Sequence, residues 1–425
     1  MGRAVQRPFI GLTAATAALG MAAVLTGCGA TGSGDVTLHL VAADYDVSGG
    51  QTSKVYWEQL TTAFEAEHPG IKVEVQIESW NDVDRKVAEM VEAGNAPDVA
   101  QIGAYADYAA DGRLYAADQL LSVPVQSNFL VPLTDAGEYK GTQYGLPFAA
   151  STRLLFYNKE LFAEAGITGT PETWDELAED ARALKDSGVR YPFALPLGPE
   201  EAQAETLMWL LSGGTGYTDA VDKYAIDSQA NISAFEWLRD ELVKPGLTGP
   251  VAPGELNRKD AFAAFTRGEV GMLNGHPSLM QAAEKEGVDV GKVELPGREG
   301  EAKGSMGVAD WIMGFKENGH RKEIGAFFDY VFSDANVLAF ARQNDLLPPT
   351  VTASEAMEKD PEHADLREFL HALPTSVLPP VGKTSWAAVS ETIKKKIGKA
   401  MEPGGSVAAT LSEIDGDAAE AEAAE

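Results

Sequence analysis

The chain has 425 residues, with 34 lysines and arginines against 64 aspartates and glutamates, so its formal net charge is −30. A surface this acidic repels polyanions, which excludes nucleic acid as a partner. The only cysteine is Cys28, so no disulfide can form within the chain.

The amino-terminal end has the pattern of a bacterial lipoprotein signal. Arg3 and Arg7 precede an uncharged apolar run over residues 9–25, and Leu-Thr-Gly stands directly before Cys28. We expect residues 1–27 to be a signal peptide, Cys28 to carry lipid on the outer face of the cell membrane, and residues 28–34 (CGATGSG) to include a flexible tether. A secretory signal cut elsewhere and a spanning helix are the alternatives, and the run is short for a span.

After the tether, strands and helices alternate. Residues 36–41, 71–77 and 98–102 have strand patterns, and residues 71–77 (IKVEVQI) alternate between apolar and polar side chains. Residues 53–68 and 82–93 carry apolar side chains at helical spacing. Strands and helices joined in this order by short connections predict an α/β sheet.

A second unit of the same kind follows. Residues 154–157 form an apolar strand, and Thr173 with Glu176 predicts a capping box for a helix that ends near residue 188. The further predicted helices are 201–211, 232–243, 258–266, 321–332, 335–343 and 386–399, and the further strands are 270–274 and 312–315. Residues 413–425 are acidic and rich in alanine, so we expect them to be frayed or disordered.

Several motifs, in their order along the chain, resemble those of one known family. They are FEAEHPGIKV (64–73), AGNAPDV (93–99), YGLPF (144–148), FYNKELF (156–162), PETWDEL (171–177), AFTRGEVGM (264–272) and the stretch from residue 328 to Pro348. Together they resemble the family 1 extracellular solute-binding proteins of bacterial ABC importers, the group that includes maltose-binding protein.

The resemblance implies an α/β, two-lobed periplasmic-binding-protein-like fold of type II. A ligand cleft lies between the lobes, and several hinge crossings join them. The implied lobes are residues 35–150 with 309–346, and residues 151–308 with 347–425. The implied function is capture of a mono- or oligosaccharide by lobe closure and its delivery to ABC permease subunits in the membrane. Such a protein is a monomer that needs neither a cofactor nor a catalytic residue.

A sugar cleft needs flat aromatic rings for the C–H faces and fixed donors and acceptors for the hydroxyls. The first candidate is Trp386, at a position where the family often places a stacking aromatic ring. Asp310 and Trp311 stand at an implied crossing between the lobes. Asp44 and Tyr45 follow the first strand, where ligands bind at the edge of a sheet.

Six further residues are candidates for the cleft. Ser151 and Arg153 stand near the first implied crossing, where the alternative for Arg153 is an ion pair with one of the many acids. His276 stands where relatives often have an aromatic residue, which puts a stacking contact there in question. The remaining three are Trp80, Tyr105 and Trp209, each with a place in the core as its alternative. We expect Trp57, Trp174 and Trp237 to be core residues.

Other functions remain as alternatives. A glycan-active enzyme outside the cytoplasm finds no support, because the chain lacks the Gly-x-Ser-x-Gly, Ser-x-x-Lys and His-Glu-x-x-His motifs. The six histidines are scattered without the spacing of metal ligands. The same fold with a polyamine, a phosphodiester or a peptide as its ligand stays open.

Overall fold

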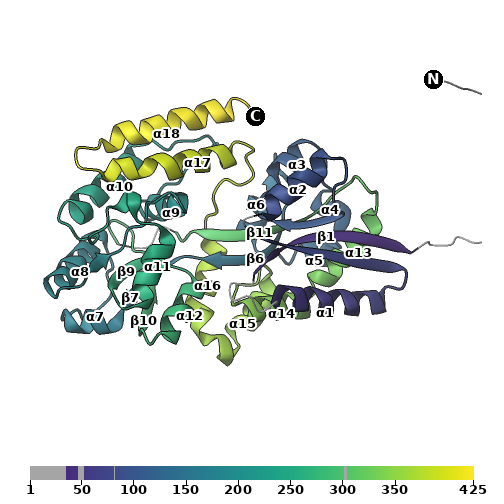
Figure 1. Cartoon of the computed structure of the whole chain (residues 1–425), viewed down its shortest axis with the longest axis horizontal. Coiled ribbons are helices and arrows are strands. Elements are labelled where there is room, and N and C mark those ends of the chain that lie inside the picture. The colour runs from purple at the N-terminus through teal and green to yellow at the C-terminus, as the bar shows by residue number, and fades with distance from the viewer. Residues whose placement is uncertain (1–34, 46–51, 81, 301–303) are drawn as a thin grey trace, which may run out of the picture. The chain divides into compact units, whose positions relative to one another are not determined.

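A computed structural model describes residues 35–45, 52–80, 82–300 and 304–425, and residues 35–425 form one compact unit (Figure 1). The predicted signal peptide (1–27), the tether (28–34) and the lipidation of Cys28 lie outside the described residues.

A five-stranded sheet has the strand order β2–β1–β3–β11–β6. Its strands are β1 (Val36–Asp44), β2 (Ile71–Ser79), β3 (Val99–Ile102), β6 (Leu146–Thr152) and β11 (Gly307–Gly314). β1 pairs in parallel with β2 and β3, whereas β11 is antiparallel to β3 and β6. Because β1 and β3 are parallel, their carboxyl ends meet at one edge of the sheet, where the candidate site begins.

Helices cover both faces of this first sheet. One face packs against α1 (Thr52–Glu67), α13 (Arg321–Val331) and α14 (Asp334–Asn344) through a core that includes Trp57 and Phe340. The other face packs against the buried valines of α2 (Val83–Glu92). Among the described residues, no single helix is long and apolar enough to cross a membrane. The pair α13 and α14 meets that test only together, with a bend of 64° between them.

A four-stranded sheet has the strand order β10–β7–β9–β8. Its strands are β7 (Leu154–Asn158), β8 (Tyr191–Phe193), β9 (Val270–Gly275) and β10 (Val290–Val293). The helices after β7 are α7 (Lys159–Glu164), α8 (Trp174–Asp186), α9 (Ala202–Ser212), α10 (Gln229–Trp237), α11 (Arg258–Thr266) and α12 (Pro277–Lys285), and α10 continues as a π-helix over Leu238–Val243.

Shorter elements and the carboxyl-terminal helices complete the fold. They are α3 (Ala106–Ala110), α4 (Ala117–Leu120), α5 (Val123–Gln126), α6 (Val131–Ala136), the hairpin β4 (Glu138–Tyr139) and β5 (Thr142–Gln143), α15 (Val351–Glu358), α16 (Arg367–Ala372), α17 (Trp386–Lys396) and α18 (Val407–Glu422). The 3-10 segments are Pro253–Glu255, Pro361–Leu366, Leu373–Thr375 and Ile397–Met401.

Within the described residues, the chain of strands passes between the two sheets at two points. β6 of the first sheet is separated from β7 of the second by Arg153 alone, and β10 of the second sheet precedes β11 of the first. The predicted lobe edges at residues 150/151 and 308/309 fall inside β6 and β11. The division into lobes at these residues stays a prediction.

The expected core tryptophans are confirmed. Trp57, Trp174 and Trp237 are 1%, 0% and 8% exposed. The indole nitrogen of Trp174 lies 2.6 Å from Ser212 Oγ and 2.9 Å from the carbonyl oxygen of Pro296, so burial leaves this polar group paired.

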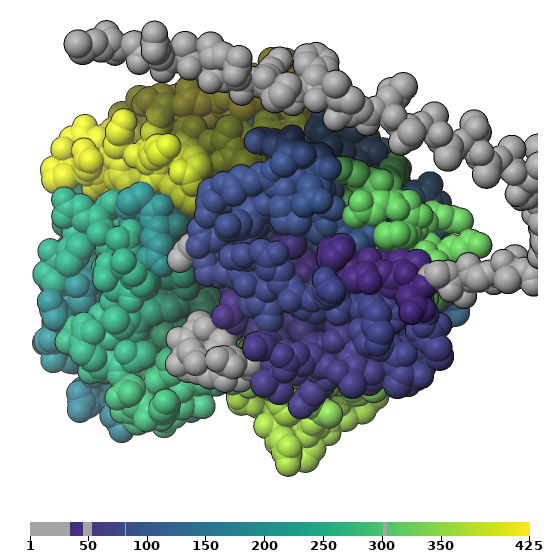
Figure 2. Space-filling model, turned by 45° about the vertical axis from the view of Figure 1, so that its right-hand side comes forward, coloured from purple at the N-terminus to yellow at the C-terminus, as the bar shows by residue number. Residues whose placement is uncertain are grey.

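The expectation of a frayed carboxyl-terminal end was wrong. Residues 407–422 form α18, which lies beside α17 (Figure 1), and Figure 2 shows both helices, in yellow, lying over the teal residues of the middle of the chain. Leu411, Ile414 and Ala418 are fully buried at helical spacing. One of the acidic residues is paired, since Glu413 Oε1 lies 2.8 Å from Lys396 Nζ. The many alanines obscured this apolar stripe in the sequence.

Candidate functional site

Three side chains from neighbouring strands meet at the carboxyl edge of the first sheet. Tyr45, which follows β1, donates its hydroxyl hydrogen to Asp310 Oδ2 of β11 at 2.8 Å. Gln101 of β3 donates from Nε2 to the Tyr45 hydroxyl at 2.9 Å. We call Tyr45, Gln101 and Asp310 the acceptor group, because the carboxylate at its end accepts hydrogen bonds.

Burial sets the protonation of the acceptor group. It raises the pKa of Asp310 to about 6, and the nearby charge of Asp84 acts in the same direction while the Tyr45 hydrogen bond opposes it. Burial, together with the charge of Asp310, raises the pKa of Tyr45 well above its ordinary value. Tyr45 is therefore a neutral phenol that donates, and Asp310 is largely ionised at neutral pH.

A second set of polar side chains lies beside the second sheet. Arg153 Nη2 lies 3.0 Å from Glu201 Oε1, and Arg258 Nε contacts the other oxygen of the same carboxylate. Arg258 Nη2 also lies 3.2 Å from Glu200 Oε1. Two arginines thus hold Glu201 from two sides. We call Arg153, Glu200, Glu201, Arg258 and His276 the ion-pair group.

His276 is neutral in the ion-pair group. Arg258 Nη1 lies 3.2 Å from His276 Nε2, and since an arginine only donates, Nε2 accepts. His276 Nδ1 then carries the hydrogen and donates to Ser278 Oγ at 2.8 Å. Burial, and next the charges of Arg153 and Arg258, lower the pKa of His276 well below its ordinary value. The imidazole therefore offers no positive charge to a ligand near neutral pH.

Behind the ion-pair group lies a buried carboxyl, that of Glu205. Its Oε1 accepts from Trp209 Nε1 at 2.8 Å and from Asn274 Nδ2 at 2.9 Å. Burial raises its pKa to about 7 against these two hydrogen bonds and the charge of Arg153. A cavity of about 20 Å³, lined among others by Arg153, Glu205 and Asn274, lies at this point.

The β6–β11 ladder places one member of each group on the same face. Asp310 pairs with Ala149 and Val308 with Ser151, so the side chains of Asp310 and Ser151 lie on the same face. Arg153 is two residues beyond Ser151, and its backbone nitrogen donates to the carbonyl oxygen of Met306 at 3.1 Å, which continues the ladder. Asp310, Ser151 and Arg153 therefore share the face on which we place the candidate site.

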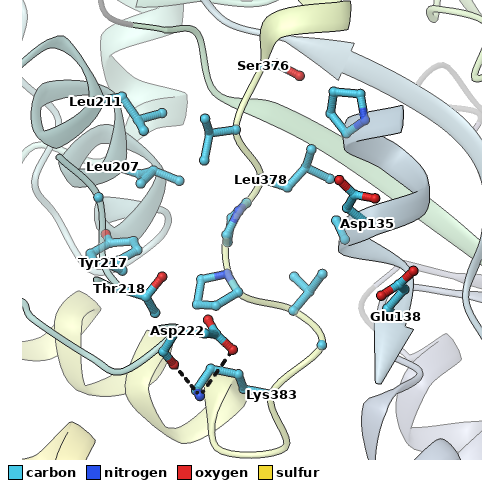
Figure 3. Close-up of a pocket in the computed structure, with 18 of the residues that line it drawn as sticks. Asp135, Glu138, Leu207, Leu211, Tyr217, Thr218, Asp222, Ser376, Leu378 and Lys383 are labelled. Carbon is cyan, nitrogen blue, oxygen red and sulfur yellow. Dashed lines mark hydrogen bonds and ion pairs between the residues drawn. The ribbon is translucent and has the colours of Figure 1, made fainter. Parts of the chain in front are cut away.

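The opposite face of the ladder packs against a connecting segment, residues 376–383. A Cβ atom at Gly307, which pairs with Thr152, would overlap Ser376 Oγ and lie 2.9 Å from Leu378 Cδ1. A cavity of about 850 Å³ lies along this segment, between Asp135 and Glu138 on one wall and Leu207, Leu211 and Tyr217 on the other (Figure 3). Within it, Lys383 Nζ donates to the carbonyl oxygen of Asp222 at 2.9 Å.

This large cavity and the two polar groups do not coincide. No member of the acceptor group or the ion-pair group lines it. We therefore place the candidate site by its chemistry, on the Asp310 face, because fixed donors and acceptors gather there. Among the described residues, no three His, Cys, Asp or Glu side chains form a group that could hold a metal ion.

The structure brings several predicted site residues together. Tyr45 and Asp310 bond directly, and Trp80 packs edge-on against Tyr45 with ring centroids 5.4 Å apart. Asp44 ends β1 beside Tyr45 and is half-buried. Ser151, Arg153 and His276 belong to the same face or to the ion-pair group, as described above.

Three predicted site residues lie in the core. Trp209 is 0% exposed, and Tyr105 and Trp311 are each 1% exposed, with their rings 5.2 Å apart. Tyr105 Oη lies 2.6 Å from the carbonyl oxygen of Ala136. No face of these three rings is open to a solute in this conformation, so the predicted stacking role does not fit them. The apolar neighbours that bury them come from distant parts of the chain, which the sequence alone did not reveal.

Trp386 belongs to neither group. Its ring is half-buried, packs against the core of the second sheet, and lies 5.3 Å from the ring of Tyr217. Its predicted contact with a sugar stays a prediction.

Sequence reasoning missed Gln101, Glu201 and Arg258. Gln101 is a polar residue near the end of a predicted buried strand, and it is 0% exposed. A polar side chain near the end of a buried strand needs a hydrogen-bond partner, so Gln101 could have been selected as a site candidate from the sequence. Glu201 and Arg258 carried none, because each looks like an ordinary charge at the start of a helix and only the fold brings them to Arg153.

Comparisons with known proteins agree with this architecture. Residues 48–337 match the model of a family described as bacterial extracellular solute-binding protein. A binding protein of Brucella abortus is 28% identical over 350 residues, which cover 81% of this chain and 83% of that protein. The multiple sugar-binding protein of Streptococcus mutans is 28% identical over 297 residues, covering 63% of this chain and 66% of that protein.

A solved structure shows the same fold. The cyclic alpha-maltosyl-1,6-maltose binding protein from Arthrobacter globiformis matches with a TM-score of 0.79 at 18% identity, over 92% of this chain and all of that chain. This likeness confirms the predicted α/β, two-lobed binding-protein fold. Because the family model matches more than half of its residues, the chain belongs to the bacterial extracellular solute-binding proteins.

Proposed function

We propose that this protein captures a mono- or oligosaccharide outside the cytoplasm and delivers it to the permease of an ABC importer, while lipid on Cys28 holds it at the cell membrane. The observation that carries the proposal is that one face of the β6–β11 ladder holds Asp310 of the acceptor group, Ser151 and, just beyond the ladder, Arg153 of the ion-pair group, where the chain leaves the first sheet for the second.

The chemistry of the two groups suits a sugar. Each hydroxyl both donates and accepts, and the site offers acceptors at Asp310 and Glu201 and donors at Arg153 and Arg258. A closed cleft that leaves such a group unpaired loses about 1–3 kcal/mol, which gives specificity. A relative 28% identical to this chain is named as a multiple sugar-binding protein, which favours the same ligand class.

Binding without catalysis fits this arrangement. Tyr45, Gln101 and Asp310 come from the first sheet, whereas the ion-pair group lies beside the second. A solute that contacts both groups favours the conformation in which they are close, because it gains contacts there that an open form lacks. Capture and release need no bond to be made or broken, so we propose that the protein is not an enzyme.

We propose a binding site that keeps most of the predicted residues and adds two. The proposed ligand-contacting residues are Asp44, Tyr45, Trp80, Ser151, Arg153, Glu201, Arg258, His276, Asp310 and Trp386. The proposed lobes are residues 35–150 with 309–346, and residues 151–308 with 347–425.

A thermal-shift screen of residues 35–425, the compact unit, tests the ligand class. The panel contains maltotriose, cellobiose, diacetylchitobiose and raffinose, with spermidine and glycerol 3-phosphate as non-sugars. A ligand at a hundred times its dissociation constant stabilises the folded state by about 2.7 kcal/mol, so a bound sugar raises the melting temperature measurably. Small-angle scattering with that sugar then measures closure.

A matched pair of variants tests whether the sugar-dependent rise in melting temperature comes from binding at the proposed site. Glu201→Gln removes the charge held by Arg153 and Arg258 and should reduce the sugar-dependent shift. Glu241→Gln makes the same change in the exposed pair with Arg182, where Nη2 and Oε2 are 2.6 Å apart, and should leave the shift unchanged.

A polyamine is the second candidate ligand, because among the described residues no lysine or arginine is paired with Asp310 or Asp84. A shift with spermidine and with no sugar would replace the carbohydrate proposal by this one.

A further inference from the structure

Three hydrogen bonds in series connect the backbone of β1 to Asp310. The Ala43 backbone nitrogen donates to Gln101 Oε1 at 3.0 Å, Gln101 Nε2 donates to Tyr45 Oη at 2.9 Å, and Tyr45 Oη donates to Asp310 Oδ2 at 2.8 Å. The series crosses β1, β3 and β11, and it ends on the face of the proposed site.

The direction of the whole series follows from its first member. A backbone N–H can only donate, so the amide oxygen of Gln101 must face Ala43, and its NH2 group must then face Tyr45. Because the NH2 group only donates, the Tyr45 oxygen accepts there and its own hydrogen goes to Asp310. Tyr45 therefore always donates in this hydrogen bond, and Asp310 Oδ2 always accepts.

The surroundings hold this series in place. Gln101 is 0% exposed. The ring of Tyr45 lies between Trp80 and Phe340, with ring centroids 5.4 and 5.0 Å away and both contacts edge-on. Burial keeps the pKa of Tyr45 well above its ordinary value, so the phenol keeps its hydrogen. An amide flip or a tyrosine rotation would break at least one buried hydrogen bond.

We propose that Gln101 is a positioning residue which directs the Tyr45 hydroxyl hydrogen onto Asp310 and so favours the ionised, acceptor-only form of that carboxyl, to which the solute presents a donor, a hydroxyl or an ammonium. This inference deepens the proposed function and rests on it for the identity of the ligand. The direction of the hydrogen bonds within the free protein does not depend on any ligand.

Replacing the acceptor that residue 310 presents to the solute by a donor tests the inference. In Asp310→Asn, Tyr45 still donates, so the amide oxygen faces Tyr45 and the NH2 group faces the solute. The NH2 group of the new amide then faces the donor of the solute, and neither can accept from the other. We expect the affinity for the saccharide with the largest thermal shift to fall at least tenfold by calorimetry, with an unchanged circular dichroism spectrum.

A second change should restore the lost affinity. In Gln101→Glu, the carboxylate accepts from both Ala43 and Tyr45, which turns the Tyr45 hydrogen away from residue 310. In the double variant Q101E/D310N, the NH2 group of the new amide at position 310 can donate to Tyr45 Oη, and the amide oxygen again faces the solute. We expect the double variant to bind at least threefold more tightly than D310N. Equal or weaker binding would overturn the inference, because a purely structural role of Gln101 predicts additive losses.

A titration of the ligand-free protein separates this inference from the proposed function. The carboxyl carbon shift of Asp310, assigned with D310N, should titrate near pH 6 in the wild type. In Q101E the midpoint should rise by at least one pH unit, because Asp310 loses its donor and gains a negative neighbour.

The control for this titration is Gln119→Glu, which alters an exposed amide whose oxygen accepts from Ala116 at 3.0 Å, and it should leave the midpoint unchanged. An unmoved midpoint in Q101E overturns the inference. A moved midpoint without any saccharide binding supports the hydrogen-bond series and defeats the carbohydrate proposal.

Discussion

Only some ionisable residues of the proposed site change their charge near neutral pH. His276 is neutral, since burial and next the charges of Arg153 and Arg258 lower its pKa, and its Nε2 accepts from the Arg258 guanidinium. Burial raises the pKa of Asp310 to about 6 and that of Glu205 to about 7. The carboxyl groups, rather than the usual histidine, therefore carry the pH response of the site.

Affinity for the solute should fall as the pH drops through 6. An ionised Asp310 accepts a hydrogen bond more strongly than the protonated acid does, so one pH unit below its pKa the dissociation constant should be up to about tenfold higher. Calorimetry between pH 5 and 8 measures this. In D310N the contribution should vanish, and an unchanged pH profile in that variant would show that another group is responsible.

The effect of Asp310 on stability has the opposite sign. Its pKa is higher in the folded protein than its ordinary value, so its stabilising contribution is complete at low pH and is lost as the pH rises through 6. A pH-dependent change in unfolding free energy must therefore be measured separately from the change in affinity.

Trp386 offers a direct test of aromatic stacking. Its ring is half-buried against Tyr217, which leaves part of it accessible. Trp386→Ala should weaken saccharide binding at least tenfold, or about 1.4 kcal/mol, while Trp386→Phe should keep most of the affinity. Fluorescence titration and thermal melting distinguish the roles. A large drop in melting temperature with unchanged affinity would assign Trp386 to the core.

At the scale of elements, the sequence predicted most of the longer helices from their periodicity, but it missed α12 and α18, most of the short helices and several strands. Residues 258–266 were predicted as a helix and form α11 with those bounds. β6 was missed because Pro147 and small residues hide its pattern, and β11 begins at Gly307 rather than at the predicted residue 312. Both strands lie where the chain crosses between sheets, so their side chains meet several environments and follow no simple alternation.

The start of α8 shows a local signal that the structure bears out. Thr173 Oγ1 accepts from the Glu176 backbone nitrogen at 3.2 Å, as predicted. The second half of the predicted capping box differs, because Glu176 Oε2 accepts from the backbone nitrogen of Glu172 at 2.8 Å and not from that of Thr173.

Removal of this cap should lower stability without affecting binding. Thr173→Ala leaves a helix donor unpaired, and we expect the unfolding free energy in urea to fall by about 1 kcal/mol. The control is Thr168→Ala, an exposed position outside any helix. If both variants unfold at the same urea concentration, the cap contributes nothing measurable.

At the scale of the whole molecule, close backbone approaches fix the segment 376–383 beside the first sheet. A Cβ atom at Gly382 would overlap the carbonyl oxygen of Glu138 and lie 3.1 Å from Tyr105 Oη. Gly307 meets Ser376 in a similar way. Glycine is needed at these positions because only a hydrogen atom fits between the two chain segments.

A methyl group at this contact should disturb the connection. Gly382→Ala forces the segment away from Glu138, and we expect a loss of about 1–3 kcal/mol of stability. Urea unfolding measures the loss. Gly169→Ala, where no atom lies within 4 Å of the added carbon, is the control. Equal stability of the two variants would show that the segment moves aside freely.

The sequence by itself determined what depends on local order. Periodicity and turn residues predicted the α/β elements, and the ordered motifs indicated the solute-binding family that the comparisons show. Tyr45, Ser151, Arg153, His276 and Asp310 were selected because they follow strand ends or stand near predicted crossings, where side chains converge.

Only the tertiary structure decided which of these side chains meet, and with what. The pairing of Gln101 with Tyr45 spans 56 residues and that of Tyr45 with Asp310 spans 265, so no window of sequence contains either contact. Burial also removed Tyr105, Trp209 and Trp311 from the set of available rings. Hydrogen bonds and burial depend on distance in space, and folding alone brings remote residues of the chain within that distance.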